Sequence, residues 1–166
     1  MILYFLRHAD AGPVGATAAE DDARRLTAGG EAELQGAAEL WRRLRVRPEV
    51  VISSPLPRAQ RAAELLVDGI GSEVGITVDE RLRPGATWSD LSAALADHHT
   101  MERALFVGHQ PDLARVIELL SGASRVAMQL GSLACLEFEG EPAPGAGRLN
   151  WLLDPHLYLS EFDHEH

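Results

Sequence analysis

The chain begins with an apolar run, Met1–Leu6, that ends directly in the charged pair Arg7 and His8. An apolar run of this length, bounded by polar residues, is typical of a buried strand. Two further runs of the same kind occur at Val50–Ile52 and Ala104–Val107, and a stretch with helical periodicity follows each of these two. Such alternation of strands and helices predicts an α/β fold whose sheet is covered by helices on both faces.

The rest of the chain predicts a three-layer sandwich around a mixed, mostly parallel sheet that finishes in antiparallel strands. The second long helix is expected to begin with Ser54 as cap and Pro55 at the first helical position. Residues 9–25 are expected to form a loop and residues 155–166 a loosely packed tail. The predicted strands are Met1–Leu6, Glu49–Ser53, Ile76–Val78, Ala104–Val107, Leu133–Phe138 and Arg148–Leu153, and the predicted helices are Thr27–Arg45, Ser54–Gly69, Thr87–Ala96 and Pro111–Leu120.

Length and charge restrict the class of protein. A chain of 166 residues is expected to form one domain over residues 1–166. Its 15 Lys and Arg against 25 Asp and Glu give a net charge of −10, so no general basic field exists to attract nucleic acid or an anionic membrane. The single cysteine, Cys135, fits a reducing compartment. The apolar start is too short for a signal peptide, and no apolar run reaches the roughly 20 residues of a membrane span. We therefore expect a cytoplasmic protein.

The pair Arg7 and His8 lies where open α/β sheets place their ligand chemistry, at the carboxyl end of a strand. An arginine forks onto phosphate oxygens, and a neutral imidazole attacks phosphorus when a hydrogen bond to its other ring nitrogen fixes the tautomer. Asp10 and a backbone carbonyl are equally suited to supply that hydrogen bond. Taken alone, an aspartate such as Asp10 is more often a turn residue.

Arg58 and His109 follow the other two apolar runs at comparable positions. An arginine in the first turn of a helix is unfavourable unless an anion lies nearby, so Arg58 together with free backbone N–H groups predicts a phosphate site. His109 comes directly after Gly108, which allows close backbone approach, and is placed to bind phosphate oxygens. The alternative for Arg58 is a solvated helical arginine. In isolation, His109 is equally well explained as a hydrogen-bonded polar residue near the sheet edge.

No metal or cofactor site is expected. There is no paired-cysteine or H-E-x-x-H pattern, no Walker loop and no G-x-G-x-x-G segment. Adjacent histidines point apart in either a helix or a strand, and the C-terminal histidines fall in the expected tail. These residues are His98, His99, His156, His164 and His166.

The three motifs in this order resemble the histidine phosphatase superfamily, also called the phosphoglycerate mutase-like superfamily. The resemblance rests on Arg7-His8, on the S-S-x-x-x-R segment that ends in Arg58, and on Gly108-His109, and it extends from about Met1 to Leu153. The segment Arg25-Leu26-Thr27 with Gly30, and the compact length, are similar to the SixA-like phosphohistidine phosphatases. Ala9 stands where the family usually has glycine. We expect the backbone conformation at this position to tolerate its small side chain.

The resemblance implies the phosphoglycerate mutase-like fold and a metal-independent, two-step phosphoryl transfer. His8 would attack phosphorus, and Arg7, Arg58 and His109 would bind the phosphate oxygens. Many relatives use a glutamate as proton donor after the third strand. Glu80 lies near that region, but the following Pro84-Gly85 resembles the SixA-like pattern, in which that acid is missing.

These observations predict a phosphohistidine phosphatase that works through a covalent phosphohistidine on His8. Its expected partner is a histidine-phosphorylated protein or a small phosphorylated substrate. We expect it to bind neither nucleic acid nor a membrane. One alternative is a small-molecule phosphomonoesterase of the same superfamily, with Glu80 or Asp10 as the acid. The other is a module that binds a phosphorylated ligand without turnover.

Overall fold

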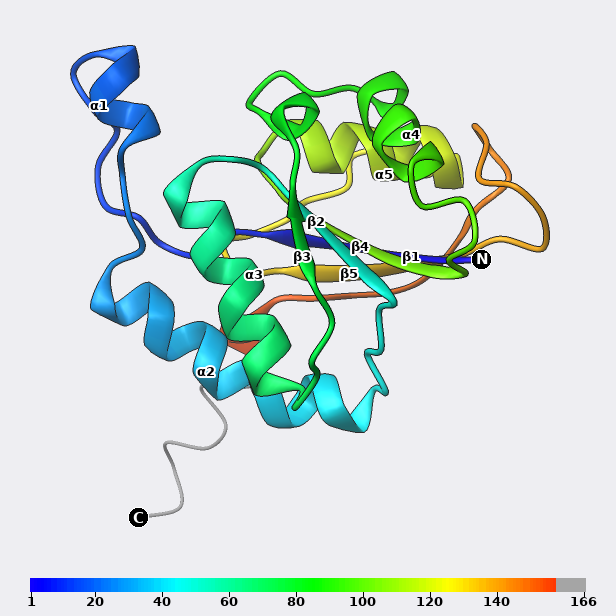
Figure 1. Ribbon diagram of the computed structural model, residues 1–166, viewed down its shortest axis with the longest axis horizontal. Coiled ribbons are helices and arrows are strands. Elements are labelled where there is room, and N and C mark those ends of the chain that lie inside the picture. Colours follow the sequence, from blue (N-terminus) through cyan, green and yellow to red (C-terminus); the bar gives the residue numbers. More distant parts are fainter. Residues whose placement is uncertain (158–166) are drawn as a thin grey trace.

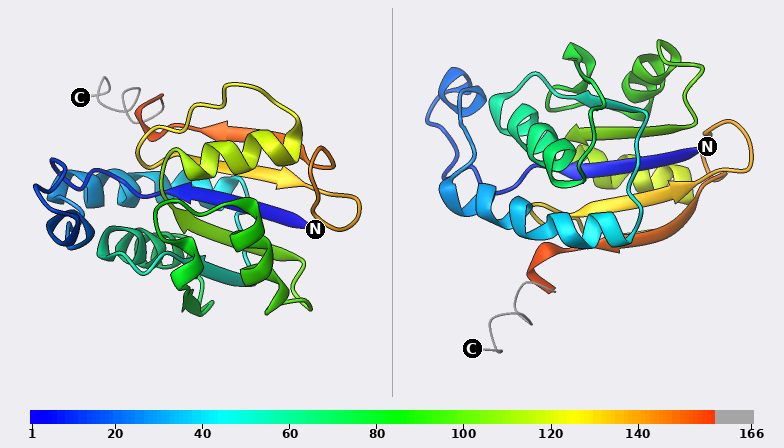
Figure 2. Two further views of the ribbon diagram at one scale, coloured as in Figure 1. Left: turned by 90° about the horizontal axis from the view of Figure 1, so that it is seen from above. Right: turned by 60° about the horizontal axis from the view of Figure 1, so that its bottom comes forward.

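The computed structural model describes residues 1–157 and contains a six-stranded sheet with helices on both sides (Figures 1 and 2). The strands are β1 (Ile2–Arg7), β2 (Val50–Ser53), β3 (Ile76–Val78), β4 (Arg103–Gly108), β5 (Leu133–Glu137) and β6 (Arg148–Leu153). The helices are α1 (Ala18–Asp22), α2 (Ala28–Arg43), α3 (Pro57–Gly69), α4 (Trp88–Ala96) and α5 (Asp112–Ser121), with a short 3-10 helix at Glu80–Leu82.

The central strand β1 contributes to a hydrophobic core on each face of the sheet. Leu3 and Phe5 pack with residues of α4 and α5, whereas Tyr4 and Leu6 pack with residues of α2 and α3. Side chains alternate across a strand, so a strand covered on both faces needs apolar residues at every position. This is why Met1–Leu6 is a continuous apolar run, and it explains the three layers.

Sheet order places three strand ends side by side. The order is β3-β2-β4-β1-β5-β6; β1 to β4 run parallel, and β5 and β6 are antiparallel to their neighbours. In the register, Arg7 lies opposite Gly108, and Ser53 lies opposite Val107. The carboxyl ends of β1, β2 and β4 therefore meet at one edge. The predicted mixed sheet with an antiparallel finish is confirmed.

The start of α3 differs from the prediction. Ser54 is not its cap, because the Ser54 N–H continues the sheet by donating to the Val107 carbonyl at 3.0 Å. The helix begins three residues later at Pro57, with Leu56 as the preceding residue and no side-chain cap. The Ser54 hydroxyl accepts from Leu56 N at 3.2 Å instead. A serine that extends the strand and a second proline that opens the helix account for the shift.

The expected loop over residues 9–25 contains a short helix, α1, which projects at the margin of the molecule (Figure 1). It has no buried residue, so it produces no apolar periodicity. Its sequence signal is a capping box, in which Thr17 accepts from Glu20 N and the Glu20 side chain accepts from Thr17 N.

The start of α2 is as predicted, with Thr27 as cap. Thr27 N also donates to the Asp10 carbonyl at 2.9 Å, which joins this helix to the loop after β1. A Cβ atom at Gly30 would lie 2.4 Å from the same carbonyl oxygen. Only glycine allows the Asp10 carbonyl to come this close to the helix. Thr27 and Gly30, the two residues of the SixA-like segment at the start of α2, therefore both hold the loop after β1 in place.

The predicted loose tail is wrong for its first residue, because Pro155 is buried. His156 Nε2 also lies 3.3 Å from a Glu33 carboxylate oxygen. His164 and His166 fall outside the described residues. Within residues 1–157, no helix combines the length and the apolar character that crossing a membrane requires.

We expect Gly30→Ala to lower the free energy of unfolding by about 1–3 kcal/mol, because its methyl group overlaps the Asp10 carbonyl. Gly29→Ala is the matched control, since a Cβ there meets its nearest atom, Thr27 Oγ1, at 3.8 Å. Both changes lie in the first turn of α2, so the helix-propensity gain is shared. Urea unfolding of both variants measures the difference, and equal stabilities would contradict the close contact.

Candidate active site

The edge at which β1, β2 and β4 end borders a cavity of about 350 Å³. The structure brings all four predicted site residues together there, because Arg7, His8, Arg58 and His109 all line this cavity. Asp10 lines it as well, whereas Glu80 is exposed, binds Arg83 and is absent from the lining. The other lining residues are Ala11, Gly12, Val14, Asp21, Arg24, Pro84, Gln110 and Leu130.

His8 is buried and held in one tautomer. Its Nδ1 lies 2.8 Å from the Ala9 carbonyl oxygen, and because a carbonyl only accepts, Nδ1 carries the proton. The lone pair is therefore on Nε2, towards which Arg58 Nε donates at 3.4 Å. Of the two candidates for this role, the structure uses the backbone carbonyl. Asp10 instead accepts from the Thr27 hydroxyl at 3.0 Å and from Gly12 N at 3.2 Å.

His109 lies beside His8, with ring centroids 5.3 Å apart. Its Nε2 is 2.7 Å from the Ser54 hydroxyl, and its Nδ1 is buried without a hydrogen-bond partner among the described residues. Arg7 also lines the cavity, and its Nε is likewise buried without a hydrogen-bond partner among the described residues. Its Nη1 donates to the Met128 carbonyl at 2.8 Å. A buried unpaired N–H group such as Arg7 Nε is costly, and an oxyanion is a partner that would satisfy it.

Both histidines are neutral at pH 7. Burial, aided by the positive charges of Arg58 and Arg7, lowers the pKa of His8 to about 4. Burial likewise lowers the pKa of His109 to about 3, with smaller contributions from His8 and Arg58. A neutral His8 has a free electron pair on Nε2, which is the state that a nucleophile needs.

Arg58 is almost fully buried, with 4% of its side chain exposed. As the second residue of α3, it lies at the helix end where a positive charge is unfavourable. Its Nη1 donates to the Asp21 carbonyl at 2.8 Å, and its Nη2 is 3.7 Å from the Asp21 carboxylate.

Two lining residues, Arg24 and Asp21, were not predicted. Arg24 Nε donates to Asp21 Oδ1 at 2.7 Å, and its Nη1 donates to the Gly12 carbonyl at 2.9 Å. The sequence does contain a pattern that identifies Arg24: in an R-x-L-T segment the arginine stands two residues before the leucine, and that position relative to Leu26 is Arg24, not Arg25. Arg25 is exposed and lies outside the cavity lining. Asp21 carried no motif and is recognisable only from the fold.

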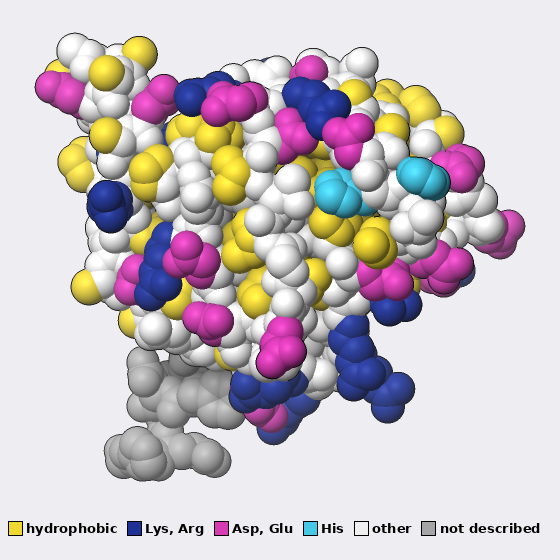
Figure 3. Space-filling model, in the orientation of Figure 1, with side chains coloured by type: hydrophobic (Ala, Val, Ile, Leu, Met, Phe, Trp, Pro, Cys, Tyr) yellow, Lys and Arg dark blue, Asp and Glu magenta, His cyan; other side chains and the backbone are white. Residues whose placement is uncertain are grey.

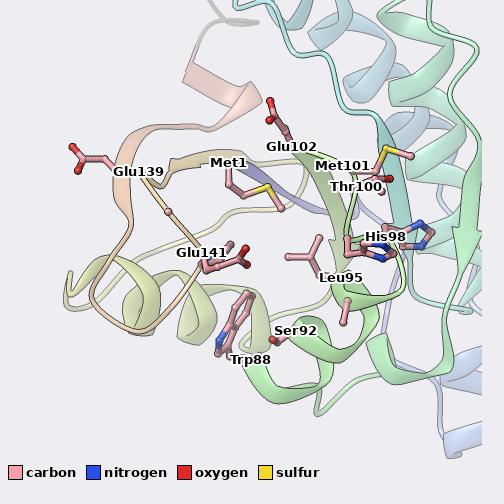
Figure 4. A pocket seen from close by; sticks show the side chains of 14 residues that line it. Met1, Trp88, Ser92, Leu95, His98, Thr100, Met101, Glu102, Glu139 and Glu141 are labelled. Atoms are coloured by element: carbon pink, nitrogen blue, oxygen red, sulfur yellow. The ribbon is translucent and has the colours of Figure 1, made fainter.

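A second and larger cavity, of about 530 Å³, lies at the opposite end of the sheet, beside Met1 and Glu102 (Figure 4). Trp88 and Leu95 of α4 line it, with His98 on the loop that follows. None of the predicted phosphate-binding residues lies there, so the smaller cavity is the candidate active site despite its size.

Acidic and basic side chains are interspersed over the face shown in Figure 3. Among residues 1–157, no group of three or more His, Cys, Asp or Glu side chains is placed to hold a metal ion.

Comparison with known proteins gives a consistent result. Residues 3–129 match the model of the histidine phosphatase superfamily, branch 1. An uncharacterized protein of Picosynechococcus sp. is 36% identical over 128 residues, covering 73% of each chain. The protein histidine phosphatase SixA, solved in complex with tungstate, has a TM-score of 0.81 at 24% identity and covers 95% of this chain and 99% of its own. A mycobacterial glucosyl-3-phosphoglycerate phosphatase in complex with VO3 has a TM-score of 0.67 at 20% identity, with coverages of 90% and 97%. At these identities, the two solved structures establish the predicted fold.

We expect the buried neutral histidines to make stability depend on pH. Their folded pKa values, about 4 for His8 and about 3 for His109, lie below the ordinary value of 6.5. The contribution of the two neutral histidines to the free energy of unfolding is therefore complete above pH 6.5. It is lost as the pH falls towards their pKa values in the folded protein. Replacing both by asparagine should flatten the dependence of unfolding free energy on pH in this window. Denaturant unfolding at several pH values measures both slopes, and parallel curves would refute the neutral, desolvated state.

Proposed function

The chain belongs to the histidine phosphatase superfamily, and we propose that it is a phosphatase that hydrolyses phosphohistidine through a covalent intermediate on His8. The observation that carries the proposal is the state of His8. Its Nδ1 proton is held by the Ala9 carbonyl, and its unprotonated Nε2 lies within hydrogen-bond reach of Arg58 on the wall of an arginine-lined cavity. This arrangement suits in-line attack on a phosphorus atom.

The proposed reaction has two steps. His8 Nε2 forms a bond to phosphorus while the bond from phosphorus to the substrate nitrogen breaks. The substrate imidazole, protonated beforehand at its other ring nitrogen, departs as neutral imidazole, so this step needs no proton donor. A water oxygen then attacks phosphorus, the bond to His8 breaks, and inorganic phosphate is released. The bond from Nδ1 to the Ala9 carbonyl stabilises the positive charge that His8 acquires in the intermediate.

Arg7, Arg24 and Arg58 are proposed to neutralise the phosphoryl oxygens, with His109 as a further contact. Three guanidinium groups supply the positive charge that a metal ion provides in other phosphoryl-transfer sites. The proposed chemistry is therefore metal-independent.

The choice of phosphohistidine rests on the leaving group. An alkoxide needs a proton donor, whereas a protonated imidazole leaves readily. The carboxylates that line the cavity are poor donors: the bonds from Gly15 N and Arg24 lower the pKa of Asp21, and Asp10 is bound to Thr27. Glu80 is bound to Arg83 outside the cavity lining.

The rim of the cavity suits a substrate presented on a protein. Val14 lines the cavity and is 77% exposed, and Pro84, another lining residue, is exposed as well. Exposed apolar side chains at the mouth of a polar site favour contact with another protein surface over a highly charged metabolite. We propose a histidine-phosphorylated protein as the partner.

His8→Ala is expected to abolish turnover and the acid-labile phosphoenzyme, because His8 is the proposed nucleophile and Nε2 of the neighbouring His109 is bound to the Ser54 hydroxyl. Rapid-quench labelling with a radioactive phosphohistidine substrate measures both, with and without EDTA. His98→Ala, which removes a histidine of the second cavity, is the control and should behave like the natural chain. Normal labelling of the His8 variant, or loss of activity with EDTA, would contradict the mechanism.

We expect higher kcat/KM for phosphohistidine than for phosphoglycerates or sugar phosphates. Val14→Ser should lower kcat/KM for a phosphorylated protein roughly fivefold, as loss of about 1 kcal/mol of apolar contact implies, and spare free phosphohistidine. Leu119→Ser, which alters an exposed leucine of α5 outside the cavity lining, is the control. A preference for a phosphate ester would indicate a small-molecule phosphomonoesterase such as the mycobacterial relative. Binding without turnover would indicate a phospho-ligand-binding module.

A further inference from the structure

Helix α1 borders the cavity through Asp21, although none of its residues is buried. Arginines from other segments attach it to the molecule. Arg58 of α3 donates to the Asp21 carbonyl, and Arg83 Nη1 lies 3.3 Å from the Asp22 carboxylate. The position of α1 therefore depends on polar contacts, and one of them involves an arginine of the proposed phosphate site.

Asp21 is the residue on which these contacts converge. Its Oδ1 accepts from Gly15 N at 3.1 Å and from Arg24 Nε at 2.7 Å. Its Oδ2 lies 3.7 Å from Arg58 Nη2, and its main-chain carbonyl accepts from Arg58 Nη1. One aspartate thus contacts two of the three cavity arginines from the side of α1.

The surroundings explain why the arginines need such a partner. Arg58 is 4% exposed at the positive end of α3, so it has lost most of its hydration and faces the helix dipole. Arg24 adds a second positive charge beside it. Without an anion between them, the two guanidinium groups would repel one another and lose their fixed orientation.

We propose that Asp21 is a positioning residue, which fixes Arg58 and Arg24 in the orientation that stabilises phosphoryl transfer. This inference rests on the proposed function of the site. Asp21 lines the cavity, but its oxygens are directed to the arginines and to Gly15, so it acts through these groups rather than on the phosphate.

A positioning role predicts a specific division between binding and catalysis. The negative charge of Asp21 repels a phosphate dianion in the ground state, whereas the arginine orientation matters most when charge develops in the transition state. Neutralising Asp21 should therefore weaken transition-state binding while leaving ground-state affinity similar or stronger. A residue needed only for folding would affect both alike.

The test compares Asp21→Asn with Asp22→Asn. Asp22 is the next residue of the same helix, carries the same charge, pairs with Arg83 and does not line the cavity. We expect Asp21→Asn to lower kcat for phosphohistidine about tenfold or more with KM changed less than about threefold, the pattern of an interaction made mainly in the transition state. Asp22→Asn should match the natural chain, and thermal unfolding of both variants checks that they are folded.

A second measurement needs no turnover. Orthovanadate adopts the five-coordinate geometry of the phosphoryl-transfer transition state, and inorganic phosphate represents the ground state. Calorimetry should show that Asp21→Asn raises the Kd of vanadate about tenfold or more and changes that of phosphate less than about threefold.

The outcomes separate this inference from the proposed function. If Asp21→Asn resembles Asp22→Asn in kcat and in vanadate affinity, or if phosphate and vanadate weaken equally, Asp21 is not a positioning residue. If the natural chain hydrolyses no phosphohistidine but Asp21→Asn selectively weakens vanadate, the substrate assignment fails and the role of Asp21 stands.

Discussion

Parallel pairing of β1 with β4, and of β4 with β2, is the constraint on which the site depends. The register places Arg7 opposite Gly108 and Ser53 opposite Val107, so the residues that follow each strand emerge at one edge. His8 and His109 are thereby brought to a ring separation of 5.3 Å from positions about 100 residues apart in the chain. The hydrophobic cores on the two faces stabilise this register, because a shift of one residue would exchange the sets of side chains that pack in each core.

The cost of this convergence is a concentration of positive charge in a partly buried space. Three arginines line the cavity, and the structure compensates for them with carbonyl oxygens and with Asp21. Burial, aided by positive charges such as that of Arg58, keeps His8 and His109 unprotonated. The groups that are suited to bind an anion therefore also help to keep the proposed nucleophile, His8, in its neutral form.

The sequence predicted the features that depend on local pattern. Continuous apolar runs mark strands that are buried on both faces, and the cap at Thr27 marks the start of α2. The start of α3 was misplaced because Ser54-Pro55 and Leu56-Pro57 are both plausible beginnings, and only pairing with Val107 decides between them. Asp21 escaped prediction because its contacts join α1 to Arg58, 37 residues away, and no local pattern records such a contact.

The polar attachment of α1 divides the molecule into parts that respond differently to dissolved electrolyte. The sheet and its two cores are held by apolar burial, which salt does not screen. By contrast, α1 is joined through partly exposed charges of Asp21, Asp22 and Arg83, within the range over which ions at physiological concentration act. We therefore expect salt to weaken the attachment of α1 beside the cavity arginines, whereas the buried bond between His8 and the carbonyl of its neighbour Ala9 is screened much less. Ionic strength should then alter how tightly the proposed phosphate site binds an anion while leaving the proposed nucleophile unchanged.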